Sequence, residues 1–415
     1  VPITPQEVAI SIRLNKTEIV RQTVHTGFRK ISPLLLIDDN PVNIFRIETN
    51  LVATSSQLLV VDSGGFIMGF SHKKLNQPPF ELCEPTWLKA LPLLANGQHP
   101  PIATLPVDSE KITLVHMSKV LTSGSLARIV SFTPSKAHST AKFRFSREGK
   151  VLRKQQELME FPHIKRTIEL PHFPSAQATR LGGLIYIRCN GPNGEQSLVT
   201  YDEREEKRKS VLNLPRLSGT RFTVSDKYCA VLGENDSKGQ LYVYDRKTMQ
   251  LYRKATLNGD TNEHIPFISR DWVVAGHSSG VTGLNIIDEQ RDWKYEGFAT
   301  ACNFVQYEDK IYSVELTRMM RTKLLSFATS GERTKLNTLV LPNLGSRKFP
   351  IIKRHQNTLI ICTEKTCFGL QLPSCKILWQ VPSPEKMPRN APSIVSENSL
   401  YTVSKEAIWR LSLSE

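Results

Sequence analysis

One segment of the chain has the residue types and spacing of a serine nucleophile. Residues 276–280 read Gly-His-Ser-Ser-Gly and match the Gly-x-Ser-x-Gly elbow of α/β-hydrolases. In that elbow the serine stands on a strained turn that opens a helix beside an oxyanion hole. Here residues 281–287 read Val-Thr-Gly-Leu-Asn-Ile-Ile, which is the alternation of a strand. We therefore predict a hairpin turn at Ser278 and no catalytic residue.

The cysteines raise the question of zinc, because Cys362, Cys367 and Cys375 follow His355 closely. Structural zinc sites prefer short Cys-x2–4-Cys knuckles in pairs, and this spacing departs from that pattern. The ten histidines form no His-x3-His or His-Glu-x-x-His arrangement. The sequence predicts no metal, no cofactor and no enzymatic activity.

The same cysteines also bear on the cellular compartment of the protein. There are seven, an odd number, and most lie in apolar strand-like runs. This usage predicts buried free thiols in a reducing compartment. We expect a cytoplasmic protein, with the periplasm as the alternative if an upstream signal was removed.

Four aspartates that end apolar runs could be taken for a ring of carboxylates around a pore. They are Asp62, Asp202, Asp245 and Asp288. Each stands before polar turn residues, where an aspartate typically accepts backbone N–H bonds. An active site needs a residue once, so repetition in phase favours a structural role.

The elements that carry these aspartates repeat along the chain. Residues 229–245 and 272–288 each contain an apolar strand, a turn and an alternating strand that ends in aspartate, and residues 198–202 end the same way. Successive aspartates in these copies are 43 residues apart, and further steps fall near Ser330 and Pro373. A fixed period of about 40 to 45 residues with four strands per repeat is the signature of a β-propeller.

Two repeats resemble known propeller repeats. Residues 280–288 resemble a strand of the WD-repeat propellers without its terminal Trp. Residues 372–379 read Leu-Pro-Ser-Cys-Lys-Ile-Leu-Trp and are similar to quinoprotein-like (pyrroloquinoline-quinone-type) propellers, in which an outer strand carries Trp. The resemblance concerns repeat shape over roughly residues 42–415 and implies a fold without an activity.

The sequence thus predicts an all-β propeller of four-stranded blades, most simply eight, with seven as the alternative. We assign residues 1–41 to an N-terminal segment and residues 42–415 to the propeller, with an inserted loop at about residues 71–108. Within that loop we expect a short helix at residues 85–94. Residues 8–14 alternate well and are predicted to close the ring with the C-terminal strands. The expected strand ends are Asp62, Ser146, Asp202, Asp245, Asp288, Ser330 and Pro373.

Charge gives the functional prediction. The formal net charge is +15, which attracts acidic protein faces or nucleic acid. Basic residues recur in expected loops of the C-terminal repeats, and blades place equivalent loops on a common face. We predict that these residues form a basic rim that binds an acidic partner. They are Arg318, Arg321, Lys323, Arg347, Lys348, Lys353, Arg354, Lys386 and Arg389.

The leading functional hypothesis is a protein–protein interaction scaffold or adaptor, such as the substrate receptor of a ubiquitin ligase. Nucleic acid is a less favoured partner, because no aromatic residues are interleaved with the basic ones. The alternatives are a quinoprotein-like periplasmic factor of outer-membrane assembly and a propeller enzyme with a site in its central channel. No run of about 18 to 20 apolar residues predicts a transmembrane helix.

Overall fold

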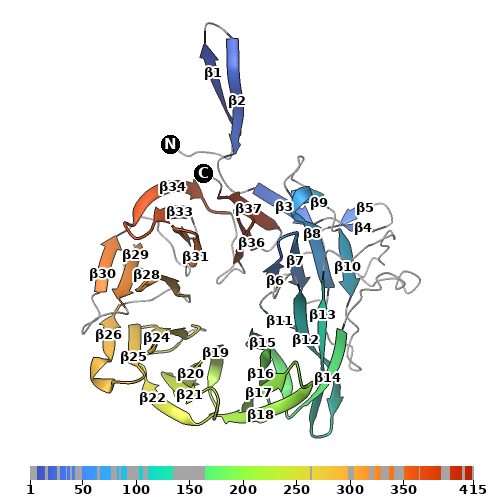
Figure 1. Cartoon of the computed structure of the whole chain (residues 1–415), viewed down its shortest axis with the longest axis vertical. Helices are drawn as coiled ribbons and strands as arrows, with labels where there is room; N and C mark the ends of the chain where they lie inside the picture. Colours follow the sequence, from blue (N-terminus) through green and yellow to red (C-terminus); the bar gives the residue numbers. More distant parts are fainter. Residues whose placement is uncertain are drawn as a thin grey trace.

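The chain folds into eight β-sheets arranged in a ring, each sheet forming one blade of a β-propeller (Figure 1). The structure is a computed structural model. It describes residues 7–14, 17–25, 29–33, 35–37, 40–42, 49–62, 66–75, 82–83, 86–90, 102–105, 111–133, 164–261, 264–297, 303–316, 322–328, 336–340, 350–363, 365–384, 393–403 and 407–413. The predicted all-β architecture with eight blades is confirmed.

The strands of each blade are antiparallel and follow the chain from the centre outward, so we call them A to D. Blade 1 consists of β6 (Thr49–Ala53), β7 (Gln57–Asp62), β8 (Phe66–Ser71) and β10 (Trp87–Ala90). Blade 2 consists of β11 (Ile102–Thr104), β12 (Ile112–Leu121), β13 (Gly124–Phe132) and β14 (Ile164–Leu170). Blade 3 consists of β15 (Phe173–Leu181), β16 (Leu184–Asn190), β17 (Gln196–Asp202) and β18 (Lys207–Leu214).

The next four blades continue this order around the ring. Blade 4 consists of β19 (Ser218–Val224), β20 (Tyr228–Asn235), β21 (Lys238–Asp245) and β22 (Leu251–Thr256). Blade 5 consists of β23 (Phe267–Ser269), β24 (Trp272–His277), β25 (Gly280–Asn285) and β26 (Trp293–Glu296). Blade 6 consists of β27 (Val305–Tyr307), β28 (Lys310–Leu316), β29 (Thr322–Ala328) and β30 (Leu336–Val340). Blade 7 consists of β31 (Ile351–His355), β32 (Thr358–Cys362), β33 (Thr366–Gln371) and β34 (Lys376–Pro382).

Blade 8 joins the two ends of the chain, as predicted, but through a different N-terminal strand. Strands A to C are β35 (Ser393–Ser396), β36 (Ser399–Val403) and β37 (Ile408–Ser412), and β3 (Arg29–Pro33) pairs antiparallel with β37 as strand D. The prediction that residues 8–14 close the ring is wrong. They form β1 (Glu7–Leu14), which pairs with β2 (Thr17–His25) in a hairpin outside the ring (Figure 1).

Short elements accompany the first blade. The hairpin of β4 (Leu35–Ile37) and β5 (Asn40–Val42) follows β3, and β9 (Leu82–Cys83) pairs parallel with β3. Helix α1 (His72–Leu75) directly follows β8, whereas Trp87–Ala90, where a short helix was predicted, is strand D of blade 1. The helix prediction at residues 85–94 is therefore wrong for this stretch. Of the expected insertion at residues 71–108, Ile102–Thr104 form β11 of blade 2, and residues 76–81, 84–85, 91–101 and 106–108 lie outside the described residues.

The 43-residue period follows the ends of the C strands. These strands end at Asp202, Asp245, Asn285, Ala328 and Gln371 in blades 3 to 7. Asp288 therefore lies just beyond its strand, and Asn285 occupies the position equivalent to Asp245. The expected ends at Ser146 and Ser330 lie outside the described residues.

The sequence prediction for the end of the first repeat is wrong by one strand. Asp62 ends β7, which is strand B of blade 1, whereas strand C of that blade ends at Ser71. Blades 1 and 2 have long connections before their D strands, so the regular spacing that locates the later blades is lost there.

The hydrophobic core is divided among the junctions between blades. The junction of blades 4 and 5, for example, buries Leu241 and Val243 of one sheet against Val273 and Ala275 of the other. Similar clusters join each successive pair from blade 1 to blade 8. Each blade carries apolar side chains on both of its faces, because each face packs against a neighbouring blade.

The junction where blade 8 meets blade 1 contains a polar contact. His72 is buried there, with Nδ1 3.1 Å from the Tyr401 hydroxyl and Nε2 3.0 Å from the carbonyl oxygen of Thr54. Ser396 Oγ also donates to the Thr54 carbonyl at 3.4 Å. These hydrogen bonds connect segments from the two ends of the chain.

Two blades share a glycine–tryptophan pair between strands C and D. Gly283 pairs in register with Trp293, and Gly369 pairs with Trp379. A Cβ atom at either glycine would overlap the tryptophan ring. The tryptophan side chain on strand D therefore packs over the glycine on strand C. This contact holds the outer strand against the rest of the blade.

Replacing Gly369 with alanine is expected to reduce the free energy of unfolding by about 1–3 kcal/mol, because the new methyl group displaces the Trp379 ring. Chemical denaturation followed by tryptophan fluorescence measures the change. In a Trp379→Leu background the same replacement is expected to be nearly neutral, since the overlapping ring is gone. An equal loss in both backgrounds would contradict this account of the pair.

Candidate functional site

The segment with the spacing of a nucleophile elbow forms a hairpin, as predicted. β24 ends at His277 and β25 begins at Gly280, with Ser278 and Ser279 in the turn between them. This turn joins strands B and C of blade 5. Because strands alternate in direction, all B–C turns and all connections from strand D to the next blade lie on the same face, which we call the B–C face.

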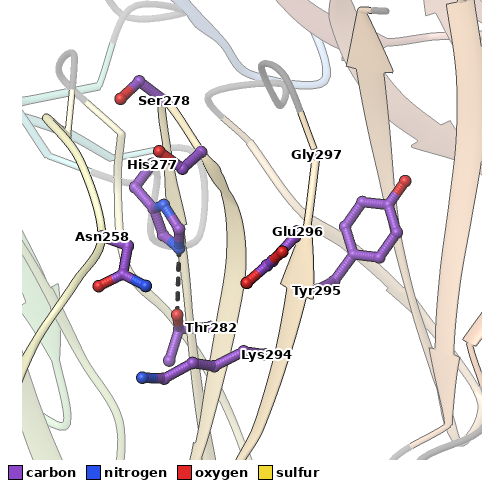
Figure 2. Close-up of a pocket in the computed structure, with 9 residues that line it drawn as sticks. Asn258, His277, Ser278, Thr282, Lys294, Tyr295, Glu296 and Gly297 are labelled. Carbon is purple, nitrogen blue, oxygen red and sulfur yellow. Dashed lines mark hydrogen bonds between the residues drawn. The ribbon is translucent and has the colours of Figure 1, made fainter.

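A pocket of about 470 Å³ opens beside this hairpin (Figure 2). Its walls come from strands B, C and D of blade 5 and from the connection that leaves blade 4. The lining residues are Asn258, His277, Ser278, Ser279, Thr282, Lys294, Tyr295, Glu296 and Gly297. The pocket is therefore lined mainly by polar groups at the junction of two blades.

A close strand contact at a glycine and a set of hydrogen bonds hold the walls of the pocket. Gly280 has φ +139°, and a Cβ atom there would collide with the carbonyl oxygen of Tyr295. The connection from blade 4 is fixed to the hairpin because the Ser278 N–H donates to the Asp260 carbonyl at 2.8 Å. In return, the Asp260 N–H donates to Ser278 Oγ at 3.2 Å. Asn258 is thereby held at one side of the pocket.

The floor is a buried hydrogen-bonded pair. His277 Nε2 lies 3.1 Å from Thr282 Oγ1, and the two residues are 4% and 2% exposed. Burial lowers the pKa of His277 from 6.5 to about 4, more than a backbone hydrogen bond at Asn258 raises it. The nearby His264 and Lys294 lower this pKa further. His277 is therefore neutral near pH 7.

The rim carries two opposite charges. Lys294 and Glu296 are exposed residues on β26 and both side chains extend into the pocket, whereas the Tyr295 ring between them points away (Figure 2). The Tyr295 hydroxyl donates to Glu315 Oε2 of blade 6 at 2.5 Å. This contact helps to hold the strand that presents the two charged residues.

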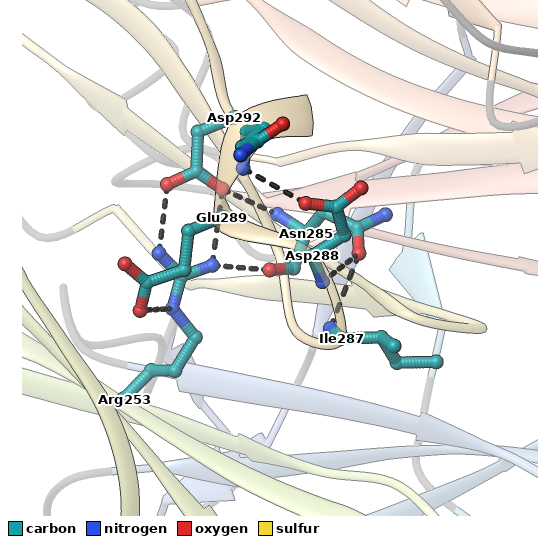
Figure 3. A network of polar contacts seen from close by, with 7 residues as sticks. Arg253, Asn285, Ile287, Asp288, Glu289 and Asp292 are labelled. Atoms are coloured by element: carbon teal, nitrogen blue, oxygen red, sulfur yellow. Dashed lines mark hydrogen bonds and ion pairs between the residues drawn. The ribbon is translucent and has the colours of Figure 1, made fainter.

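The two blades that form the pocket are also tied together at the opposite face (Figure 3). Arg253 of β22 donates from Nη1 and Nη2 to both carboxylate oxygens of Asp292, at 3.0 and 2.8 Å, and also donates to the Asn285 carbonyl. Asn285 Oδ1 accepts the backbone N–H groups of Ile287 and Asp288 at 3.1 and 2.9 Å. The Arg253 side chain is 9% exposed and that of Asp292 is 28% exposed, so a partly buried ion pair links the two blades.

The geometry favours binding over nucleophilic catalysis. His277 Nε2 bonds Thr282, and Ser278 Oγ accepts a bond from Asp260, so the serine and histidine are not arranged as nucleophile and base. Within the residues the structure describes, no group of three or more His, Cys, Asp or Glu could hold a metal ion.

Three of the four aspartates predicted to serve in turns, Asp202, Asp245 and Asp288, do so. Asp202 Oδ1 accepts the backbone N–H groups of Arg204 and Glu205 at 2.9 and 3.2 Å. Asp245 accepts those of Lys247 and Thr248 at 3.0 and 2.8 Å. These bonds hold the pKa of both carboxyl groups below the usual range. Asp288 likewise accepts the N–H of Gln290 at 3.0 Å.

Three residues of the predicted basic rim fall within the described part of the chain. Lys323 is partly exposed near the start of β29. Burial lowers the pKa of Lys353 in β31, and Arg354 donates to the Gln306 carbonyl at 2.7 Å and lies over the Tyr307 ring. The others lie outside the described residues: Arg318, Arg321, Arg347, Lys348, Lys386 and Arg389.

The prediction of free thiols is wrong for one pair. Cys362 and Cys367 are register partners on β32 and β33 and form a disulfide with a Cα–Cα distance of 3.9 Å. Cys189 and Cys229 are buried free thiols, as predicted, and burial raises the pKa of each to about 12. Antiparallel register explains the difference, because it brings two side chains directly opposite each other.

Comparison with known proteins supports the fold. No family model and no curated protein sequence matches the chain. Among solved structures, BamB from Moraxella catarrhalis matches with a TM-score of 0.51 at 10% identity, over 88% of this chain and 98% of that one. Two further matches are apo AztD from Citrobacter koseri (TM-score 0.46, 14% identity, 87% and 96% covered) and the Dos1 propeller (0.48, 10%, 74% and 73%). The chain is thus a β-propeller by both topology and comparison.

Among the described residues, no helix has the length and apolar character needed to cross a bilayer.

Proposed function

We propose that the ring is a protein-binding scaffold that engages an acidic segment of a partner on the B–C face of blades 6 to 8. The observation that supports this most directly is where the strands of these blades begin and end. β28 ends at Leu316 and β29 begins at Thr322, so the intervening connection starts and finishes on the B–C face.

The next two connections between blades have the same placement. β30 ends at Val340 and β31 begins at Ile351, and β34 ends at Pro382 and β35 begins at Ser393. All four ends lie on the B–C face. Six of the nine predicted rim residues belong by sequence to these three connections, two in each.

Lys365 adds a basic residue that the sequence argument did not include. It is exposed in the B–C turn of blade 7, on the same face and in the same part of the ring. Basic side chains concentrated on one face raise the local concentration of acidic segments and accelerate their association. Loops on a rigid ring can evolve for binding because the strands are occupied by packing.

We expect charge reversal on this face to release the partner. Arg321→Glu, Lys365→Glu and Arg389→Glu are combined in one variant, and Lys227→Glu, Lys247→Glu and Lys376→Glu on the opposite face are combined in a control. Both variants undergo the same change in net charge. Affinity purification from the native cell with quantitative mass spectrometry is expected to lose a partner at least tenfold in the first variant, by weakened charge pairing. Equal recovery with both variants would refute the proposal.

A second candidate is a scaffold of an oxidising compartment with quinoprotein-like repeats. The Cys362–Cys367 disulfide supports this candidate, because disulfides persist in the periplasm and in secreted proteins and are rare in the cytosol. The outer-strand residues Trp293 and Trp379, each covering a glycine, support quinoprotein-like repeats. In an oxidising compartment such as the periplasm, the ring would act as an assembly factor. In the cytoplasm it would act as an adaptor or a substrate receptor.

A further inference from the structure

The pocket between blades 4 and 5 contains two separated charges of opposite sign. Lys294 and Glu296 are two positions apart on β26, so both lie on the face of the blade that looks toward blade 4. Neither forms an ion pair with another residue in the described part of the chain. Both side chains instead extend from β26 toward the side of the pocket where His277 and Thr282 lie (Figure 2).

The rest of the lining is polar and adds no net charge. His277 is neutral near pH 7 because burial lowers its pKa to about 4. Asn258 and Ser279 add an amide and a hydroxyl to the lining. A ligand in this pocket therefore meets one cation, one anion and several hydrogen-bonding groups.

We propose that this pocket binds a small zwitterion of the amino-acid class, with the ligand carboxylate at Lys294 and the ligand ammonium at Glu296. A volume of about 470 Å³ suits a molecule of this size. This site is independent of partner binding by blades 6 to 8.

Charge distinguishes this ligand class from simpler ions. A phosphate or other anion would be repelled by Glu296, and a metal cation would be repelled by Lys294. An aromatic ligand lacks a stacking surface, because the Tyr295 ring points away and its hydroxyl is bonded to Glu315. A molecule that carries both charges satisfies both rim residues at once.

The test measures binding of the twenty standard L-amino acids to the full chain by titration calorimetry, up to about 10 mM ligand. At least one is expected to bind saturably. Its N-acetyl derivative lacks the ammonium and its carboxamide derivative lacks the carboxylate. Each derivative is expected to bind at least about tenfold more weakly, since each loses one charge-assisted contact.

Matched variants assign the two contacts. Lys294→Gln is expected to weaken binding of the zwitterion at least about tenfold and to leave the affinity for the carboxamide unchanged, because the carboxamide has no carboxylate for Lys294 to contact. Glu296→Gln is likewise expected to weaken binding of the zwitterion and to leave the affinity for the N-acetyl derivative unchanged, because that derivative has no ammonium for Glu296 to contact. Lys376→Gln, an exposed lysine on the outer strand of blade 7, is the control and is expected to bind like the unmodified chain.

Three results would overturn the proposal. The first is that no amino acid binds saturably. The second is that the zwitterion and its blocked derivatives bind with equal affinity, and the third is that Lys294→Gln and Glu296→Gln both leave the affinity for the zwitterion unchanged. The partner experiment is unaffected by any of them, because the residues that its charge-reversal variant replaces belong by sequence to blades 6 to 8.

Discussion

Replacing Arg180 with alanine is expected to reduce the free energy of unfolding by about 3–5 kcal/mol, the typical cost of removing one partner of a buried ion pair. Arg180 belongs to β15, and its guanidinium contacts both carboxylate oxygens of Glu203 at 2.8 and 2.9 Å. It also donates to Thr113 Oγ1 of blade 2. The side chains of the ion pair are 8% and 14% exposed, so alanine leaves a carboxylate with little water.

Thermal and chemical denaturation measure this loss, and a cooperative ring of this size is expected to melt about 5 °C lower. Arg216→Ala is the matched control, because its ion pair with Glu195 is 3.8 Å long and the Arg216 side chain is 72% exposed. Exposed pairs of this kind contribute about 0–1 kcal/mol. If Arg180→Ala and Arg216→Ala destabilise the ring equally, Arg180 does not connect blades 2 and 3 as described.

The regular half of the fold could be predicted from the sequence because short turns preserve the period. Asp202 and Asp245 each end a C strand and each accept two backbone N–H bonds in the following turn. Asn285 performs the same function in blade 5, although the arithmetic pointed to Asp288. An amide oxygen replaces the carboxylate at no cost to the turn, so a search for repeated aspartates misses it.

The closing strand and the disulfide could not be predicted, because both depend on pairing. Residues 8–14 alternate as well as any ring strand, but they are close in sequence to Thr17–His25 and form a local hairpin with them. Arg29–Pro33 is shorter and less regular, yet it pairs with β37. Likewise, Cys362 and Cys367 lie on neighbouring strands, and only the register of those strands brings the two thiols opposite each other.

The pocket depends on contacts between blades that no single segment reveals. The sequence singled out residues 276–280 for a chemistry that the hairpin does not support, yet the same hairpin supplies the floor and one wall of the pocket. Gly280 lets strands C and D approach closely beside the pocket, because a Cβ atom there would collide with the Tyr295 carbonyl oxygen. Alternation along β26 would have placed Lys294 and Glu296 on one face, but the facing connection from blade 4 was not predictable.

His277 is expected to make the ring less stable as the pH falls from about 6.5 to about 4. In the unfolded chain its pKa is near 6.5, and burial lowers the folded value to about 4. Between these values the unfolded state binds more protons than the folded state, so protonation favours unfolding. The contribution of the neutral histidine is complete above pH 6.5 and lost below pH 4.

The size of this effect follows from the pKa difference between 6.5 and about 4, which corresponds to about 3 kcal/mol. Denaturant unfolding at several pH values between 4 and 7 measures it in the unmodified chain and in His277→Gln, which retains a hydrogen-bonding group toward Thr282. Carboxylates titrate in both proteins, so the difference between the two stability curves isolates His277. That difference is expected to change by about 3 kcal/mol across the range. Parallel curves would show that His277 is not buried as a neutral imidazole, and the pocket would then hold an additional positive charge at acid pH.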